Sequence, residues 1–181
     1  MARVGACRAR QMEVESRVDA LTGLYNRRGF DEIFSRMVEV AQRTGRPIAL
    51  IYMDSDSLKT INDQHGHEAG DRFIVDLASI LRSVARRSDF IFRWGADEFA
   101  VLLESGNESK ATTFAQRLRK AVAERTTGTV SVGIYCGTPE NASEAVRAAD
   151  AAMYSAKSQG KDRVVVSGSD RRGRDEHQAS S

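Results

Sequence analysis

The chain has 181 residues, of which 41% are hydrophobic and 29% charged, with a net charge of +2. This composition predicts one soluble domain whose core needs neither disulfides nor a metal. Lysine and arginine are scattered, which argues against a nucleic-acid surface. Cys7 and Cys136 are too few for a disulfide framework or a zinc site, so we expect a cytoplasmic protein. No apolar run could cross a membrane, and the N-terminus lacks the apolar region of a signal peptide.

The first half of the chain predicts two helices and a buried strand. Residues 8–19 carry a thin apolar stripe and suggest a lead-in helix that packs on a partner or continues a coiled coil. A second helix begins after Asn26, a good helix cap, and ends at Gly45 and Pro47. Residues 48–53 are continuously apolar, which is typical of a buried central strand.

The elements that follow alternate between helix and strand. A turn and short helix over 54–63 lead to a second helix that ends near Val84. The remaining predicted elements are a hairpin of strands 89–94 and 98–103, a helix near 108–125, a strand over 129–135, a helix near 143–158 and a strand over 163–166. Residues 167–181 are polar without apolar anchors, and we expect them to be disordered.

From strand 48–53 onward this order is β-α-β-β-α-β with an added α-β unit. It predicts an α+β, ferredoxin-like or palm-type sheet with helices packed around it, as in nucleotidyl cyclases. In that topology the first strand lies antiparallel beside the third. The end of the first strand therefore meets the tip of the hairpin, and Asp54 and Asp97 become neighbours.

Two adjacent carboxylates repel each other unless a cation lies between them. Mg²⁺ binds few protein carboxylates and keeps positions open for phosphate oxygens. Asp54, the Ser55 carbonyl and Asp97, with Glu98 beside them, would supply such a partial shell. The alternative is a pair of unrelated, solvated acidic turns.

Four stretches, residues 19–28, 54–71, 93–103 and 149–161, together resemble the GGDEF domain of the diguanylate cyclase family. The resemblance covers nearly all of residues 19–166. It divides the chain into a linker helix at 1–18, a GGDEF domain at 19–166 and a polar tail at 167–181.

The resemblance implies an enzyme that condenses two GTP molecules into cyclic di-GMP and releases two pyrophosphates. It implies Mg²⁺ or Mn²⁺ as cofactor, and a homodimer, because each half-site holds one GTP. Asp54 and Asp97 would bind the metal with the Ser55 carbonyl, and Glu98 would support that site. Asp97 is also the candidate that accepts the proton of the attacking 3′-hydroxyl. Apart from this proton transfer, catalysis of the step is mostly positioning and charge neutralisation.

The resemblance also assigns residues to the substrate. Asn62 and Asp71 match guanine-reading positions, since a carboxylate accepts from the N1–H and 2-amino group that adenine lacks. Their alternative role is helix capping. His67 either lines the ribose or braces the turn. Three lysines match positions beside the triphosphate and would neutralise it: Lys59, Lys157 and Lys161.

A second site is implied by Arg86 and Asp89, which match the RxxD motif of product inhibition. Arg86 would hold a phosphate of cyclic di-GMP, and Asp89 would accept from its guanine. This match predicts an enzyme that is inhibited by its own product.

The chain departs from the family pattern at the signature turn, where Ala96 stands in place of the second glycine. Alanine there would cost about 1 kcal/mol if the turn needs a left-handed backbone, and its methyl would crowd GTP. Ser57 and Leu58 replace an aromatic residue, and Lys161 replaces the usual arginine. We expect an active or weakly active cyclase. The alternatives are a degenerate domain that only binds GTP or cyclic di-GMP, and a different nucleotidyl cyclase or palm-type polymerase.

Overall fold

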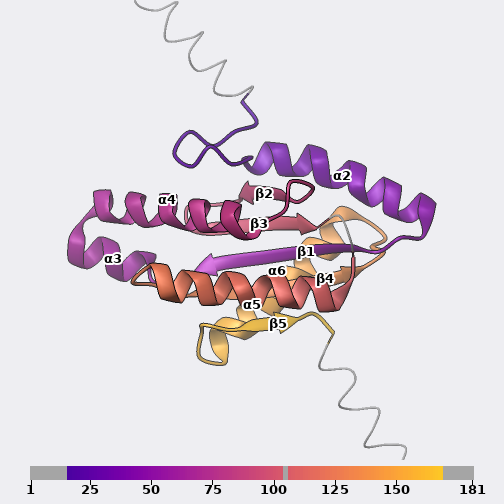
Figure 1. Cartoon of the computed structure of the whole chain (residues 1–181). Coiled ribbons are helices and arrows are strands. Elements are labelled where there is room, and N and C mark those ends of the chain that lie inside the picture. Colours follow the sequence, from indigo (N-terminus) through magenta and orange to yellow (C-terminus); the bar gives the residue numbers. More distant parts are fainter. Residues whose placement is uncertain (1–15, 104–105, 169–181) are drawn as a thin grey trace, which may run out of the picture.

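The computed structural model of the protein describes residues 16–103 and 106–168 (Figure 1). Its helices are α2 (Arg27–Thr44), α3 (Leu58–His65), α4 (His67–Val84), α5 (Glu108–Arg125) and α6 (Ala142–Ser158). Its strands are β1 (Ile48–Ser55), β2 (Phe90–Arg93), β3 (Glu98–Leu103), β4 (Val130–Gly137) and β5 (Val164–Val166). None of these helices is both long and apolar enough to span a bilayer.

The strands form one sheet in the order β2-β3-β1-β4-β5. β1 is the central strand and runs antiparallel to both β3 and β4, whereas β5 is parallel to β4. This is the predicted ferredoxin-like βαββαβ arrangement, with α6 and β5 as the added unit. The α+β prediction is therefore confirmed.

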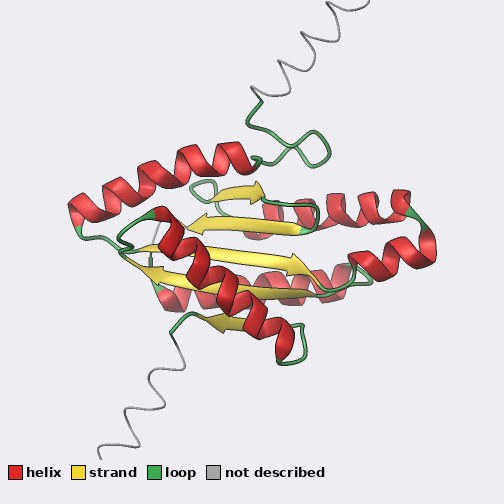
Figure 2. Ribbon diagram, turned by 180° about the vertical axis from the view of Figure 1, so that it is seen from behind, coloured by secondary structure: helices red, strands yellow, loops and turns green. Residues whose placement is uncertain are grey.

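Helices cover both faces of the sheet, with α4 and α5 along one face and α6 crossing the other (Figures 1 and 2). The alternation of side chains along β1 builds both cores, since Ile51 and Met53 pack toward α4 and α5 while Leu50 and Tyr52 pack toward α2 and α6. All eight residues of β1 are buried. Asp54 continues this alternation and lies on the α6 face, at the end of an otherwise apolar strand.

The helix boundaries follow local signals in the sequence. The Asn26 side chain accepts from the backbone N–H of Gly29 at 3.1 Å and caps α2, and Gly45 ends that helix in a left-handed conformation (φ 65°). β1 and β4 each extend two residues beyond their predicted C-terminal ends, and β4 begins one residue later than predicted, because the two strands pair along their whole length.

The stretch before α2 differs from the predicted lead-in helix. Residues 1–15 lie outside the described part of the chain, and Val18 forms an isolated β-bridge with Tyr25 instead of a helical turn. The Asp19 carboxylate accepts from the backbone N–H and the hydroxyl of Thr22, which folds this stretch into a turn. At the other end, the Ser167 N–H still donates to the Ile134 carbonyl at 2.7 Å, and residues 169–181 of the predicted tail lie outside the described residues.

Candidate active site

The acidic residues of β1 and of the β2–β3 turn lie side by side, as the topology predicts. Asp54 pairs with Glu98 in the antiparallel register, and the Ser55 N–H donates to the Asp97 carbonyl at 3.1 Å. Asp54 is 9% exposed, and Asp97 and Glu98 are half-buried. Three carboxylates from two strands thus share one end of the sheet.

These carboxylates destabilise one another's charged forms. Burial raises the pKa of Asp54, Lys157 lowers it, and Asp97 and Asp56 raise it again, with a net increase. Burial also raises the pKa of Glu98, and the charges of Asp54 and Asp97 add to the effect. A cation added to this site would relieve the repulsion.

Lys157 supplies part of that positive charge. Its ammonium extends from α6 to within 2.7 Å of Oδ1 of Asp54. This contact makes Lys157 the charge partner of a buried carboxylate oxygen. One ammonium faces three carboxylates, so a divalent ion would lower the repulsion that remains among them.

The chemistry of these residues fits Mg²⁺ or Mn²⁺ with most of the shell left to other ligands. Among the described residues no group of three or more histidine, cysteine or acidic side chains is arranged to hold a metal. Mg²⁺ usually takes only one or two carboxylates and completes its octahedron with water and phosphate oxygens. The Ser55 hydroxyl accepts from the N–H groups of Ser57 and Leu58, both at 3.1 Å, so only its carbonyl is left for an ion.

The signature turn shows why one glycine is replaceable and the other is not. The only described non-glycine residues with positive φ are Lys161 and Asp162. Ala96 therefore has no left-handed backbone, and the expected strain there is wrong; its side chain is exposed. A Cβ on Gly95, in contrast, would come well under 3.0 Å from a carboxylate oxygen of Glu98. The glycine that the site requires is Gly95.

The predicted guanine-reading residues lie on the α3–α4 hairpin. Oδ1 of Asn62 is buried without a hydrogen-bond donor, and the side chain fits only because Gly70 has no Cβ. Gly66 reverses the chain between the two helices with φ 81°. Asp71 and His67 are exposed in the first two turns of α4, and Lys59 is exposed on α3. The Asn62 side chain packs against Gly70, which directly precedes Asp71 in the chain. The His67 side chain forms no hydrogen bond with the described residues of this hairpin.

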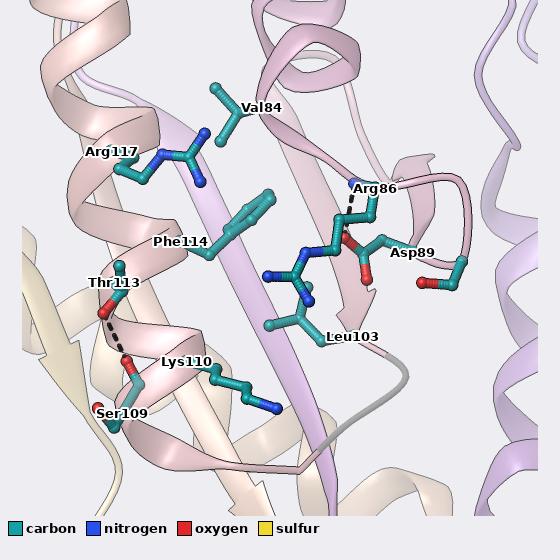
Figure 3. A pocket seen from close by; sticks show the side chains of 10 residues that line it. Val84, Arg86, Asp89, Leu103, Ser109, Lys110, Thr113, Phe114 and Arg117 are labelled. Atoms are coloured by element: carbon teal, nitrogen blue, oxygen red, sulfur yellow. Dashed lines mark hydrogen bonds between the residues drawn. The ribbon is translucent and has the colours of Figure 1, made fainter.

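A separate cavity of about 290 Å³ contains the predicted product-binding residues. The Asp89 carboxylate accepts from the Arg86 N–H at 2.8 Å, so the two form one turn at the end of α4 (Figure 3). Across the cavity, Lys110 and Arg117 extend from α5 toward Arg86. The sequence analysis did not single out these two basic residues, because their position opposite Arg86 depends on how α5 packs.

Comparison with known proteins identifies the fold and its family. The family model described as "Diguanylate cyclase, GGDEF domain" matches residues 16–163. This chain belongs to the GGDEF family. The structure is similar to the crystal structure of the GGDEF domain of DgcB from Caulobacter crescentus in complex with c-di-GMP, with a TM-score of 0.81 and 32% identity, over 84% of this chain and 94% of that one.

Curated relatives share the domain within longer proteins. The chain is 34% identical to the diguanylate cyclase DosC of Escherichia coli over 82% of its own length and 35% of that protein. It is also 34% identical to MucR of Pseudomonas aeruginosa, a bifunctional diguanylate cyclase and cyclic di-GMP phosphodiesterase, over 79% of its length and 22% of that protein. The chain thus spans about a third or less of these two relatives.

In this GGDEF domain the turn is braced by Arg93, which the sequence analysis did not single out. The guanidinium donates to both oxygens of Asp19 at 3.1 and 3.2 Å, and to the carbonyls of Gly95 and Ala96 at 3.2 and 2.8 Å. Burial raises the pKa of Asp19, but hydrogen bonds from Thr22 and Arg93 outweigh it and hold the pKa below its ordinary value. Arg93 thereby connects the stretch before α2 to the signature turn.

Asp56, which directly follows β1 and lies two residues after Asp54, has a structural role. Its carboxylate accepts from the hydroxyls of Thr129 and Ser131 at 2.9 and 2.6 Å and from the Asp162 N–H at 3.1 Å. These bonds, with an ion pair from Arg119 to Asp162 at 3.0 Å, hold the left-handed turn that carries Lys161. A strained turn of this kind persists only when its surroundings fix it.

Proposed function

We propose that this domain is a diguanylate cyclase that condenses two GTP molecules into cyclic di-GMP. The observation that carries the proposal is the cluster of Asp54, Asp97 and Glu98 at one end of the sheet, where burial and mutual repulsion raise the pKa of Asp54 and Glu98. Such a cluster is expensive unless it serves a cation. The similarity to DosC supports the same reaction.

Asp54, the Ser55 carbonyl, Asp97 and Glu98 would hold Mg²⁺ or Mn²⁺. The bound ion supplies charge neutralisation at the phosphates of GTP. In each step a ribose 3′-oxygen attacks the α-phosphorus of the other GTP, and its bond forms as the bond to the pyrophosphate oxygen breaks. The 3′-hydroxyl proton passes to Asp97, which is half-buried beside Asp54.

Lysines neutralise the remaining charge of the triphosphate. Lys157 already contacts Asp54 and would move its ammonium to the phosphates when a metal ion takes over that contact. Lys161 is presented by the turn that Asp56 fixes, and Lys59 is exposed on α3, beside the end of β1. Asn62 and Asp71 would read guanine, and the Asn62 oxygen without a donor fits the 2-amino group. His67 would contact the ribose.

Each domain provides one such half-site, so we propose that catalysis requires a homodimer in which two bound GTP molecules face each other. β1 is the central strand, and its C-terminal end, which carries Asp54, lies at one end of the sheet. Cyclic di-GMP would also bind in the cavity of Arg86 and Asp89, with Lys110 and Arg117 adding positive charge for its two phosphates.

The test incubates the protein with GTP and MgCl₂ and separates the nucleotides by liquid chromatography with mass detection. We expect cyclic di-GMP from the wild type and none from Asp54→Asn. A domain that only binds nucleotide would show saturable GTP or cyclic di-GMP binding with no product. Arg86→Ala leaves the backbone hydrogen bond to Asp89 intact. We expect the half-inhibitory concentration of cyclic di-GMP to be at least tenfold higher for this variant than for the wild type.

A further inference from the structure

One polar group in the core of β1 points at the proposed metal site. Tyr52 pairs with Ala100 and Asp54 with Glu98, so Tyr52 and Glu98 are diagonal neighbours on the same face of two antiparallel strands. The Tyr52 side chain is 3% exposed, and its hydroxyl lies close to the Glu98 carboxylate, to which it can donate a hydrogen bond. The other β1 residues before Asp54 are aliphatic, so packing alone does not require a hydroxyl here.

The ring that carries this hydroxyl is fixed by its neighbours. Trp94 meets Tyr52 edge to face at 5.6 Å, and Phe30 meets Trp94 in the same way at 4.4 Å. The guanidinium of Arg27 covers Trp94 at 4.5 Å from the ring centre. A buried ring packed against an indole that is itself held by two neighbours keeps its hydroxyl in one place.

The Glu98 carboxylate is restricted from the opposite direction as well. It lies against Gly95, so close that a Cβ at that position would force the carboxylate to move. The carboxylate therefore occupies a narrow slot between the glycine of the turn and the hydroxyl of Tyr52. Carboxylates that bind metal ions are oriented by such hydrogen bonds from residues that do not touch the ion.

We propose that Tyr52 is a positioning residue, whose hydroxyl holds the Glu98 carboxylate toward Asp54 in the orientation that binds a divalent cation. The inference rests on the proposed function, because it requires Glu98 to be a metal ligand. The bland alternative is a tyrosine hydroxyl that only satisfies its own hydrogen bond. The two readings differ in what happens to metal affinity when the hydroxyl is removed.

The experiment titrates the protein with Mn²⁺ in the absence of nucleotide and follows free Mn²⁺ by electron paramagnetic resonance. We expect Tyr52→Phe to bind Mn²⁺ roughly tenfold more weakly than the wild type. The matched control is Tyr135→Phe, which removes a hydroxyl from another buried tyrosine of the same core, beside Gly137 and away from the turn. We expect its Mn²⁺ affinity to be unchanged. If Tyr52→Phe folds poorly, Tyr52→Leu removes the same hydroxyl with a residue typical of this core.

A second background shows whether the hydroxyl acts through Glu98. In Glu98→Ala, the additional Tyr52→Phe change should have no further effect on Mn²⁺ affinity. An equal loss in both backgrounds, or full affinity in Tyr52→Phe, overturns the positioning role while the metal site stands. A wild type that binds no Mn²⁺ contradicts the metal site itself, and the role of Tyr52 falls with it.

Discussion

Single substitutions at the two glycine positions of the signature turn, Gly95→Ala and Ala96→Gly, distinguish effects on the stability of this domain from effects on its activity. Gly95→Ala places a Cβ against the end of the Glu98 side chain, while the Glu98 Cδ and Cβ stay at 3.4 and 3.5 Å, which are ordinary contacts. Gly95 has no positive φ, so alanine introduces no backbone strain. Only the Glu98 carboxylate has to move.

The two effects of that movement differ in size. Turning a flexible side chain away from its preferred rotamer costs about 1 kcal/mol, which lowers the melting temperature by roughly 2–4 °C in a domain of this size. A reacting or metal-binding group displaced by about 1 Å, in contrast, loses on the order of 100-fold in rate. That loss corresponds to about 3 kcal/mol of transition-state stabilisation.

The assay compares initial rates of pyrophosphate release from GTP with thermal unfolding of the same preparations. The control is Ala96→Gly, at an exposed position without backbone strain, for which we expect a rate within threefold of the wild type. A Gly95→Ala protein with the full rate would refute the reasoning about Glu98. A tenfold faster Ala96→Gly protein would show instead that the Ala96 methyl crowds the substrate.

Three further substitutions test other parts of the site. Glu98→Gln should stabilise the metal-free protein at neutral pH by about 0.5–1 kcal/mol in chemical denaturation, because it removes a carboxylate whose pKa is raised by burial and by Asp54. An acid with a raised folded-state pKa costs stability above that pKa, so this gain should shrink as the pH falls toward 4.5. Arg93→Lys offers one nitrogen where Arg93 uses three, for Asp19 and for the carbonyls of Gly95 and Ala96, and should reduce the rate of cyclic di-GMP formation at least tenfold, measured by steady-state kinetics. Asp56→Ala leaves three donors without their acceptor and should cost about 2–4 kcal/mol in urea unfolding.

Each of these has an outcome that contradicts it. A Glu98→Gln protein that is less stable at every pH would mean that the charge of Glu98 is compensated in the folded state. An unchanged rate in Arg93→Lys would mean that the turn holds its position without the separate contacts of the guanidinium nitrogens. A urea midpoint for Asp56→Ala equal to that of the wild type would show that the Lys161 turn does not depend on Asp56.

The sequence was sufficient to predict the topology of the sheet and the proximity of the acidic end of β1 to the acidic turn of the β2–β3 hairpin. The order of elements and one rule of topology placed Asp54 beside the hairpin, and β3 and α5 have the predicted boundaries. Tyr52 and Arg93 could not be found in this way. Tyr52 reads as one more member of an apolar run, and Arg93 is one of many scattered basic residues until the fold brings Asp19 beside it.

Backbone geometry was equally out of reach from the sequence. The replaced glycine at Ala96 drew attention as a departure from the family pattern, yet the turn does not need glycine's freedom there. What the turn needs is space at Gly95, and that requirement depends on where the Glu98 side chain lies. The role of Asp56 could not be predicted from the sequence either. It lies two residues from Asp54, but its carboxylate accepts hydrogen bonds from β4 and from the turn after α6, which only the fold brings close.

The central claim is that this domain makes cyclic di-GMP, and one measurement tests it most directly. The Arg86→Ala protein, in which we expect the proposed product inhibition to be relieved, is incubated with saturating GTP and Mg²⁺, and both products are quantified. We predict cyclic di-GMP with two pyrophosphates for each molecule formed, and neither product when Asp54→Asn is added to the same protein. No cyclic di-GMP from Arg86→Ala alone, in a protein that is folded and binds GTP, would contradict the claim.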